Sequence, residues 1–153
     1  EDQKVIPGYL KEKYLIMRNK PEFGGIGPDD ENWVEAKNNE NASMSAYHQF
    51  VVIKDTSWSK FNALTFGYGD NEDNHTVLKM LYEIQLIADS WAYSNKIPKK
   101  NLGVYFHVYP LNSVQSLHVH LVDIREENLG KAFMKNIYKN MPLESLRLYF
   151  TRY

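Results

Sequence analysis

The sequence predicts an α+β domain built on an antiparallel sheet with two main helices. Apolar runs of strand length and stretches of helical periodicity follow one another in the order strand, helix, two strands, helix, strand. The chain has 153 residues, 43% hydrophobic and 24% charged, which is enough for one core without a disulfide or metal staple. We expect a single globular unit, with an arm and loops over residues 1–45 and the folded domain over residues 46–153.

The first 45 positions are rich in loop-forming residues. Prolines and glycines interrupt them repeatedly and separate a mixed segment from an acidic, asparagine-rich one. Gly24, Gly25 and Gly27 are not followed by the lysine and hydroxyl that a phosphate-binding loop requires. We therefore expect no such loop here.

A strand and a long helix come next. Residues 50–53 form a continuous apolar run, entered by His48, that is typical of a central strand. The acidic residues 70–73 suit the start of a helix better than a calcium loop, because the twelve-residue loop spacing is missing. The apolar stripe expected to face the sheet consists of Val77, Leu81, Ile84, Ala88 and Trp91.

The last third of the chain predicts three strands and a second helix. Strands over residues 103–109 and 115–123 are joined by a short connection, which favours an antiparallel hairpin. A helix is expected over residues 127–139, with the helices on one side of the sheet. A final strand is expected from the alternation of Leu146, Leu148 and Phe150 with polar residues.

Two histidines alternate with aliphatic residues in the second hairpin strand. Because successive strand side chains point to opposite faces, His118 and His120 share one face, and their aliphatic neighbours occupy the other. Hydrophobic flanks favour a semi-buried position over a solvated face. The candidate site consists of the side chains on this face, the histidine that ends the preceding apolar run and the polar turn: His107, Asn112, Ser113, Ser116, His118 and His120.

Residues 112–121 resemble the signature of the histidine triad superfamily, in which histidines alternate with hydrophobic residues along a strand. The similarity covers residues 46–123 in the family's order of elements. His48, at the start of its strand, falls where that family often has a nucleotide-facing histidine. The stretch from Tyr105 to His120, followed by a helix and a strand, is similar to the catalytic domain of scavenger decapping enzymes. The resemblance implies a HIT-like fold.

The same resemblance implies chemistry at the α-phosphate of a nucleotide derivative, by a hydrolase or nucleotidyl transferase. His118 would be the attacking nucleophile, and His120 would donate to a phosphate oxygen and stabilise the charge that grows during attack. Ser116 stands where the family has its first triad histidine, so the ring of His118 would be less firmly oriented. Ser113 would serve the leaving group. The residues expected to bind the substrate are His48, His107, Asn112 and Ser113.

Two other classes stay open. Without its first triad histidine, the domain would act as a catalytically degenerate nucleotide-binding or interaction module. Alternatively, His107, His118 and His120 would supply three nitrogen ligands to zinc, copper or iron. Asp123 and Glu126 are poorly spaced to complete such a site. We expect neither a metal nor another cofactor.

Composition narrows the choice of partners and compartment. The net charge of −1 gives no general attraction to nucleic acid or to a membrane surface, so a polyanion would need a local site. The chain contains no cysteine, which excludes a thiolate nucleophile and a disulfide framework. The expected partner is a nucleotide or nucleotide conjugate, and the resemblance implies a homodimer. We expect a soluble protein, cytoplasmic rather than secreted.

Overall fold

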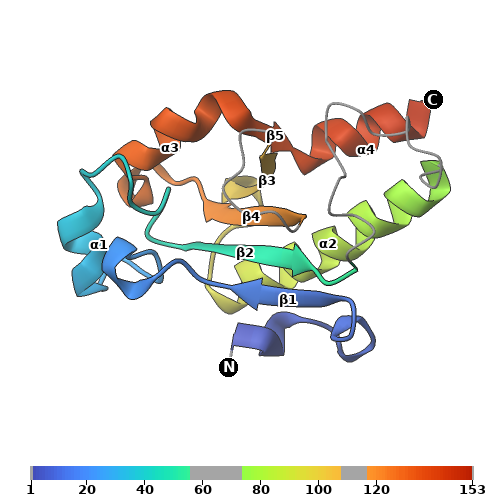
Figure 1. Cartoon of the computed structure of the whole chain (residues 1–153), viewed down its shortest axis with the longest axis horizontal. Helices are drawn as coiled ribbons and strands as arrows, with labels where there is room; N and C mark the ends of the chain where they lie inside the picture. The colour runs from blue at the N-terminus through green and yellow to red at the C-terminus, as the bar shows by residue number, and fades with distance from the viewer. Residues whose placement is uncertain (1, 56–73, 108–116, 153) are drawn as a thin grey trace.

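A five-stranded antiparallel sheet organises the chain in the computed structural model, which describes residues 2–55, 74–107 and 117–152 (Figure 1). The strand order is β1-β2-β4-β3-β5. The strands are β1 (Tyr14–Met17), β2 (His48–Ile53), β3 (Leu102–His107), β4 (His118–Asp123) and β5 (Asn140–Pro142). This sheet confirms the α+β class, and the antiparallel pairing of β3 with β4 agrees with the expected hairpin.

Within the described ranges, four α-helices accompany the sheet: α1 (Glu31–Ala36), α2 (Asn74–Ser94), α3 (Lys131–Asn136) and α4 (Leu143–Arg152). The apolar stripe expected for α2 is buried along its whole length. Helix α4 packs beside α2, and both belong to the main core. None of the helices in the described ranges has the length and apolar character that crossing a membrane requires.

The two faces of the sheet differ in chemistry. One face carries Val51 of β2, Phe106 of β3, and Val119 and Leu121 of β4, which are buried against α2 and α4. The other face carries His118, His120 and their cross-strand neighbours. We call the second face the histidine face. The alternation expected for β4 is therefore confirmed, and the core holds the strand that presents the histidines.

The last element is a helix, so the expected final strand is wrong. Leu143, Leu146 and Phe150 lie three and four residues apart and are buried together, as one face of a helix requires. Leu148, which a strand would place beside Leu146, is 46% exposed in α4. The fifth strand is instead the short β5, which precedes α4 and pairs with β3.

The helix expected over residues 127–139 is also shorter. It divides into a 3-10 turn (Glu126–Asn128), α3 and a second 3-10 turn (Ile137–Lys139). The backbone around Gly130 bonds to other segments instead of continuing a helix, because its N–H donates to the Met44 carbonyl at 3.1 Å. Ala132 of α3 packs with Val122 on the histidine face. The helices are therefore on both sides of the sheet, where one side was expected.

Residues 1–45 contribute to the sheet as well as to loops. Tyr14 and Ile16 of β1 are buried and pair with Ile53 and Val51 of β2. Gly25 has a φ of +114°, and a side chain at this position would meet Ser43. These contacts bring the glycine-rich segment against the chain that enters β2.

Candidate functional site

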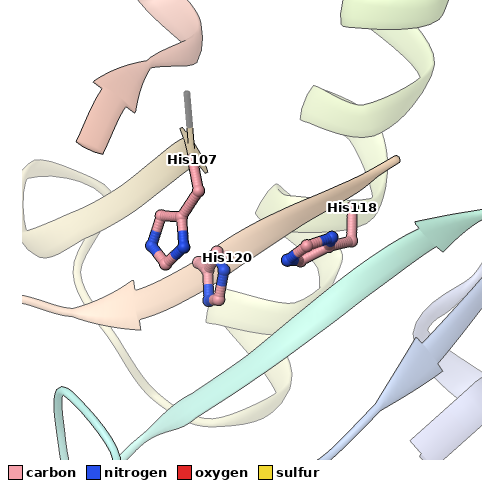
Figure 2. A group of neighbouring side chains, drawn as sticks. All are labelled: His107, His118 and His120. Carbon is pink, nitrogen blue, oxygen red and sulfur yellow. The ribbon is translucent and has the colours of Figure 1, made fainter. Parts of the chain in front are cut away.

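Four of the chain's five histidines meet on the histidine face. They come from β2 (His48), β3 (His107) and β4 (His118 and His120). The antiparallel register places Phe50 of β2 and Tyr105 of β3 opposite His120, so side chains two residues away on each strand converge on the same place. Figure 2 shows His120 between the rings of His107 and His118.

His120 lies at the centre of this cluster. Its ring stacks on that of His107, with centroids 3.8 Å apart and planes inclined by 22°. The ring of His118 lies edge-on at 5.0 Å, and that of His48 is stacked at 5.1 Å. Phe50 packs against both His118 and His120 at 5.7 and 5.9 Å. The imidazole rings are thus held in place by contacts with one another and with the ring of Phe50.

Three of these four histidines are buried. His48 and His118 are each 4% exposed and His120 is 8% exposed, while His107 is half-buried. A solvated strand face would leave such rings in water. The burial therefore agrees with the semi-buried position expected from the hydrophobic flanks.

Hydrogen bonds connect His120 to the backbone through His48. The Met44 N–H donates to His48 Nδ1 at 3.3 Å, and His48 Nε2 lies 2.8 Å from His120 Nδ1. In contrast, His107 Nε2 and His120 Nε2 are buried and have no hydrogen-bond partner among the described residues. Since buried polar atoms are nearly always paired, two such atoms on stacked rings indicate a place for a ligand.

The surroundings keep these rings neutral. Burial, followed by the nearby His118, lowers the pKa of His48 to about 4. Burial and then Lys139 lower the pKa of His107 to about 3, and burial together with His107 holds the pKa of His120 well below its usual range. Lys139 is the cation that acts on both His107 and His120, so the local field favours an anion over a cation.

A family comparison identifies the fold to which this cluster belongs. The family model described as scavenger mRNA decapping enzyme C-term binding matches residues 16–135. The chain belongs to the scavenger decapping C-terminal family. This family is HIT-like, so the fold expected from residues 46–123 is confirmed. No curated protein and no solved structure matched the chain.

The match to the scavenger decapping C-terminal family includes the whole histidine cluster, because residues 16–135 contain β2, β3 and β4. The structure brings together His48, His107, His118 and His120 of the expected site. Ser116, Asn112 and Ser113 lie outside the described residues. Their assigned roles therefore rest on the sequence.

Sequence reasoning missed three groups at this site: the Met44 backbone amide, Lys139 and Asn140. Asn140 of β5 is the register partner of His107, and its Oδ1 is buried without a hydrogen-bond partner among the described residues. Lys139 precedes it. A backbone amide leaves no trace in the sequence, and the two side chains were hidden because residue 139 was expected to end a helix.

Asp123 is excluded as a site residue by its position and partners. It is an odd number of residues from both His118 and His120, so its side chain lies on the opposite face of β4. Its carboxylate accepts hydrogen bonds from Arg125 Nη2 at 2.7 Å and Asn128 Nδ2 at 2.8 Å. Its carbonyl accepts from Ser45 Oγ at 2.7 Å. The hydrogen bond from Ser45 thus links the segment before β2 to the end of β4.

The cluster also meets the distance requirement of a metal site. His107, His118 and His120 each offer one nitrogen, and these atoms lie within 4.8 Å of one another. Three imidazoles are a donor set that zinc, copper and iron accept. The distances alone thus allow either a metal ion or an anion, and the choice depends on which nitrogens carry protons.

Proposed function

We propose that this domain binds a nucleotide derivative and acts at its α-phosphate, with His118 as the nucleophile. The observation that carries the proposal is the group of buried, neutral imidazoles around His120. Two of them, His107 and His120, present an Nε2 atom that has no hydrogen-bond partner within the described part of the chain. Membership of the scavenger decapping C-terminal family, whose description names binding and decapping, supports a nucleotide as the ligand.

The proposed step begins with the lone pair of a His118 ring nitrogen, which forms a bond to the α-phosphorus. The bond from phosphorus to the leaving oxygen or nitrogen breaks, and the leaving atom keeps the electron pair and takes up a proton. Water then attacks the phosphorus, the nitrogen–phosphorus bond returns its electrons to His118, and the proton of water is released. The product is a nucleoside monophosphate, and an alcohol in place of water gives transfer.

His120 and His107 would stabilise the charge on the phosphate oxygens during this step. Donors that are already in place in a buried site stabilise developing charge strongly, because no solvent has to reorganise. Lys139 adds a positive charge to the field at both rings. His118 lies beside His120, so attack and charge stabilisation would occur at adjacent imidazoles.

A nucleotide-binding module without turnover is the second candidate, and a specific observation favours it. Ser116 occupies the place of the first triad histidine, and a hydroxyl cannot replace the ring that orients the nucleophile in the family. In this case the imidazoles would still bind the phosphate.

The experiment that tests the proposal compares the wild-type chain with His118→Ala. Purified protein is incubated with a dinucleoside polyphosphate, a nucleoside phosphoramidate and a cap-like dinucleotide, and release of nucleoside monophosphate is measured. We expect release by the wild type and by His75→Ala, an exposed control on α2, but not by His118→Ala. Circular dichroism checks that each variant is folded.

Two results would contradict this expectation. Equal release by His118→Ala would remove His118 as the nucleophile. No turnover of any compound, combined with binding of AMP or GMP, would favour the binding module. Ser116→His then serves as a rescue, since restoring the first triad histidine should raise turnover if only the orientation of His118 is deficient.

The family relationship also supports a homodimer as part of this proposal. Light scattering on the purified chain measures the mass in solution directly. A mass of one chain at micromolar concentration would remove the dimer from the proposal and would leave the phosphate chemistry intact.

A further inference from the structure

The hydrogen bonds that end at His120 have a defined direction. A backbone N–H only donates, so the Met44 amide requires that His48 Nδ1 accept and carry no proton. A neutral imidazole carries one proton, which in His48 must then be on Nε2. That nitrogen lies 2.8 Å from His120 Nδ1 and donates to it.

The same reasoning fixes the proton of His120. Because its Nδ1 accepts from His48, the single proton of a neutral His120 must be on Nε2. This nitrogen is buried and has no acceptor among the described residues. A buried N–H without an acceptor is costly, so its natural partner is a ligand that brings an oxygen with a lone pair.

We propose that His48 is a positioning residue that sets the tautomer of His120 and so makes His120 Nε2–H a permanent donor to an anionic phosphate oxygen. The inference rests on the proposed function for the identity of the anion. It gives His48 a different task from the direct contact with phosphate or ribose expected from the sequence, since both of its ring nitrogens are already engaged by Met44 and His120.

This arrangement also decides between an anion and a metal ion. A metal on His120 Nε2 needs a lone pair there, which moves the proton of His120 to Nδ1. His48 Nε2 would then have to accept, and its own proton would move to Nδ1, where it would face the Met44 N–H. Two buried donors, His48 Nδ1–H and the Met44 N–H, would then face each other without an acceptor. An anion at His120 Nε2–H leaves both hydrogen bonds of His48 intact.

Nitrogen-15 NMR of the full chain, labelled at histidine and kept free of metal, tests the tautomer directly. Two-bond couplings between ring protons and nitrogens show which nitrogen of each imidazole carries hydrogen. We expect His48 and His120 both to be protonated at Nε2 at pH 7. A proton on Nδ1 of His120 would overturn the inference, whatever the chain does to nucleotides.

Two variants at position 48 test its consequence, with AMP as the probe. In His48→Gln the amide oxygen can accept from Met44 while the NH₂ group donates to His120, so we expect AMP affinity within about threefold of wild type. His48→Leu has neither group, and we expect AMP affinity to fall roughly 10-fold or more. The spectrum of His48→Leu should also lose the fixed His120 tautomer.

The outcomes separate this inference from the proposed function. Equal AMP affinity in His48→Leu and the wild type would overturn the inference. The expected tautomers and the expected Gln–Leu difference, without any turnover, would support the inference and remove catalysis from the proposed function. Failure of the wild type to bind AMP would overturn the proposed function, while the metal-free spectrum alone would still decide whether His48 sets the tautomer.

Discussion

The rings of His107 and His120 stack with their centroids 3.8 Å apart, on adjacent strands of one sheet. Two charged imidazoliums at this distance would repel each other strongly in a buried place. The pKa values of both rings are lowered, first by burial. The stability of the native state therefore requires that these histidines are neutral.

The first prediction concerns acid sensitivity. The unfolded chain binds protons on its histidines below their ordinary pKa of about 6.5, whereas His48 takes one up only near pH 4. Between these values the unfolded state holds more protons, so the free energy of unfolding should fall as the pH drops from 7 to 4. We expect a loss on the order of 3 kcal/mol from His48 alone. Urea unfolding at several pH values in a chelating buffer measures it.

Replacement of a single histidine provides the control for this acid sensitivity. His48→Gln should reduce the number of protons taken up on unfolding at pH 5.5 by about one. His75→Gln, which removes an exposed histidine outside the cluster, is the matched control variant. An unchanged dependence in His48→Gln would show that His48 titrates normally in the native protein.

The second prediction concerns the buried carboxylate at the end of β4. Asp123→Ala leaves Arg125 and Asn128 without their acceptor, so we expect a loss of about 3 kcal/mol in the free energy of unfolding. Glu144→Ala removes a partner of Arg147 in an exposed ion pair and should change stability little. Chemical denaturation of both variants measures the difference. Similar values would show that the Asp123 network does not stabilise the fold.

The third prediction distinguishes the helix α4 from the strand that the sequence favours. Phe150→Ala should destabilise the protein by about 3 kcal/mol, because Phe150 is buried in the main core. Leu148→Ala should change stability by less than about 0.5 kcal/mol, since that side chain is largely exposed. In a strand the two side chains would share a face, so comparable losses would contradict the helix.

The fourth prediction concerns metal affinity. A glutamate at position 48 accepts from both Met44 and His120, which moves the proton of His120 to Nδ1 and frees Nε2 to bind a metal. We expect His48→Glu to bind zinc roughly 10- to 100-fold more tightly than the wild type. Competition with a chromophoric chelator measures this, with His48→Gln as the neutral control. Equal zinc affinity in His48→Glu and His48→Gln would contradict the assignment of the protons.

The elements that the sequence predicted well are those whose apolar pattern fits only one kind of secondary structure. The run 50–53 and the stripe of α2 fit a single pattern, and both formed as expected. Leu146, Leu148 and Phe150 fit two patterns, because residues 146 and 150 are compatible with a strand and a helix alike. Leu143 decides between them, since it completes the buried helical face.

The site was predictable to the extent that it depends on strand alternation. The shared face of His118 and His120 follows from their spacing alone. The hydrogen bond between His48 and His120 depends on the register between β2 and β4, which the sequence does not specify. The Met44 amide depends on the path of the backbone before β2, which no spacing of side chains in the sequence specifies.

The carbonyl of Gly25 accepts the backbone N–H of His48 at 2.9 Å, and the conformation of Gly25 is one that only glycine adopts easily. A larger residue at position 25 would displace the start of β2. The imidazole of His48, which in our proposal sets the tautomer of His120, would move with it. A variant in the amino-terminal loops would thus disturb the proposed phosphate site with every histidine in place, and a survey of variants restricted to the histidines would underestimate how much of the chain that site depends on.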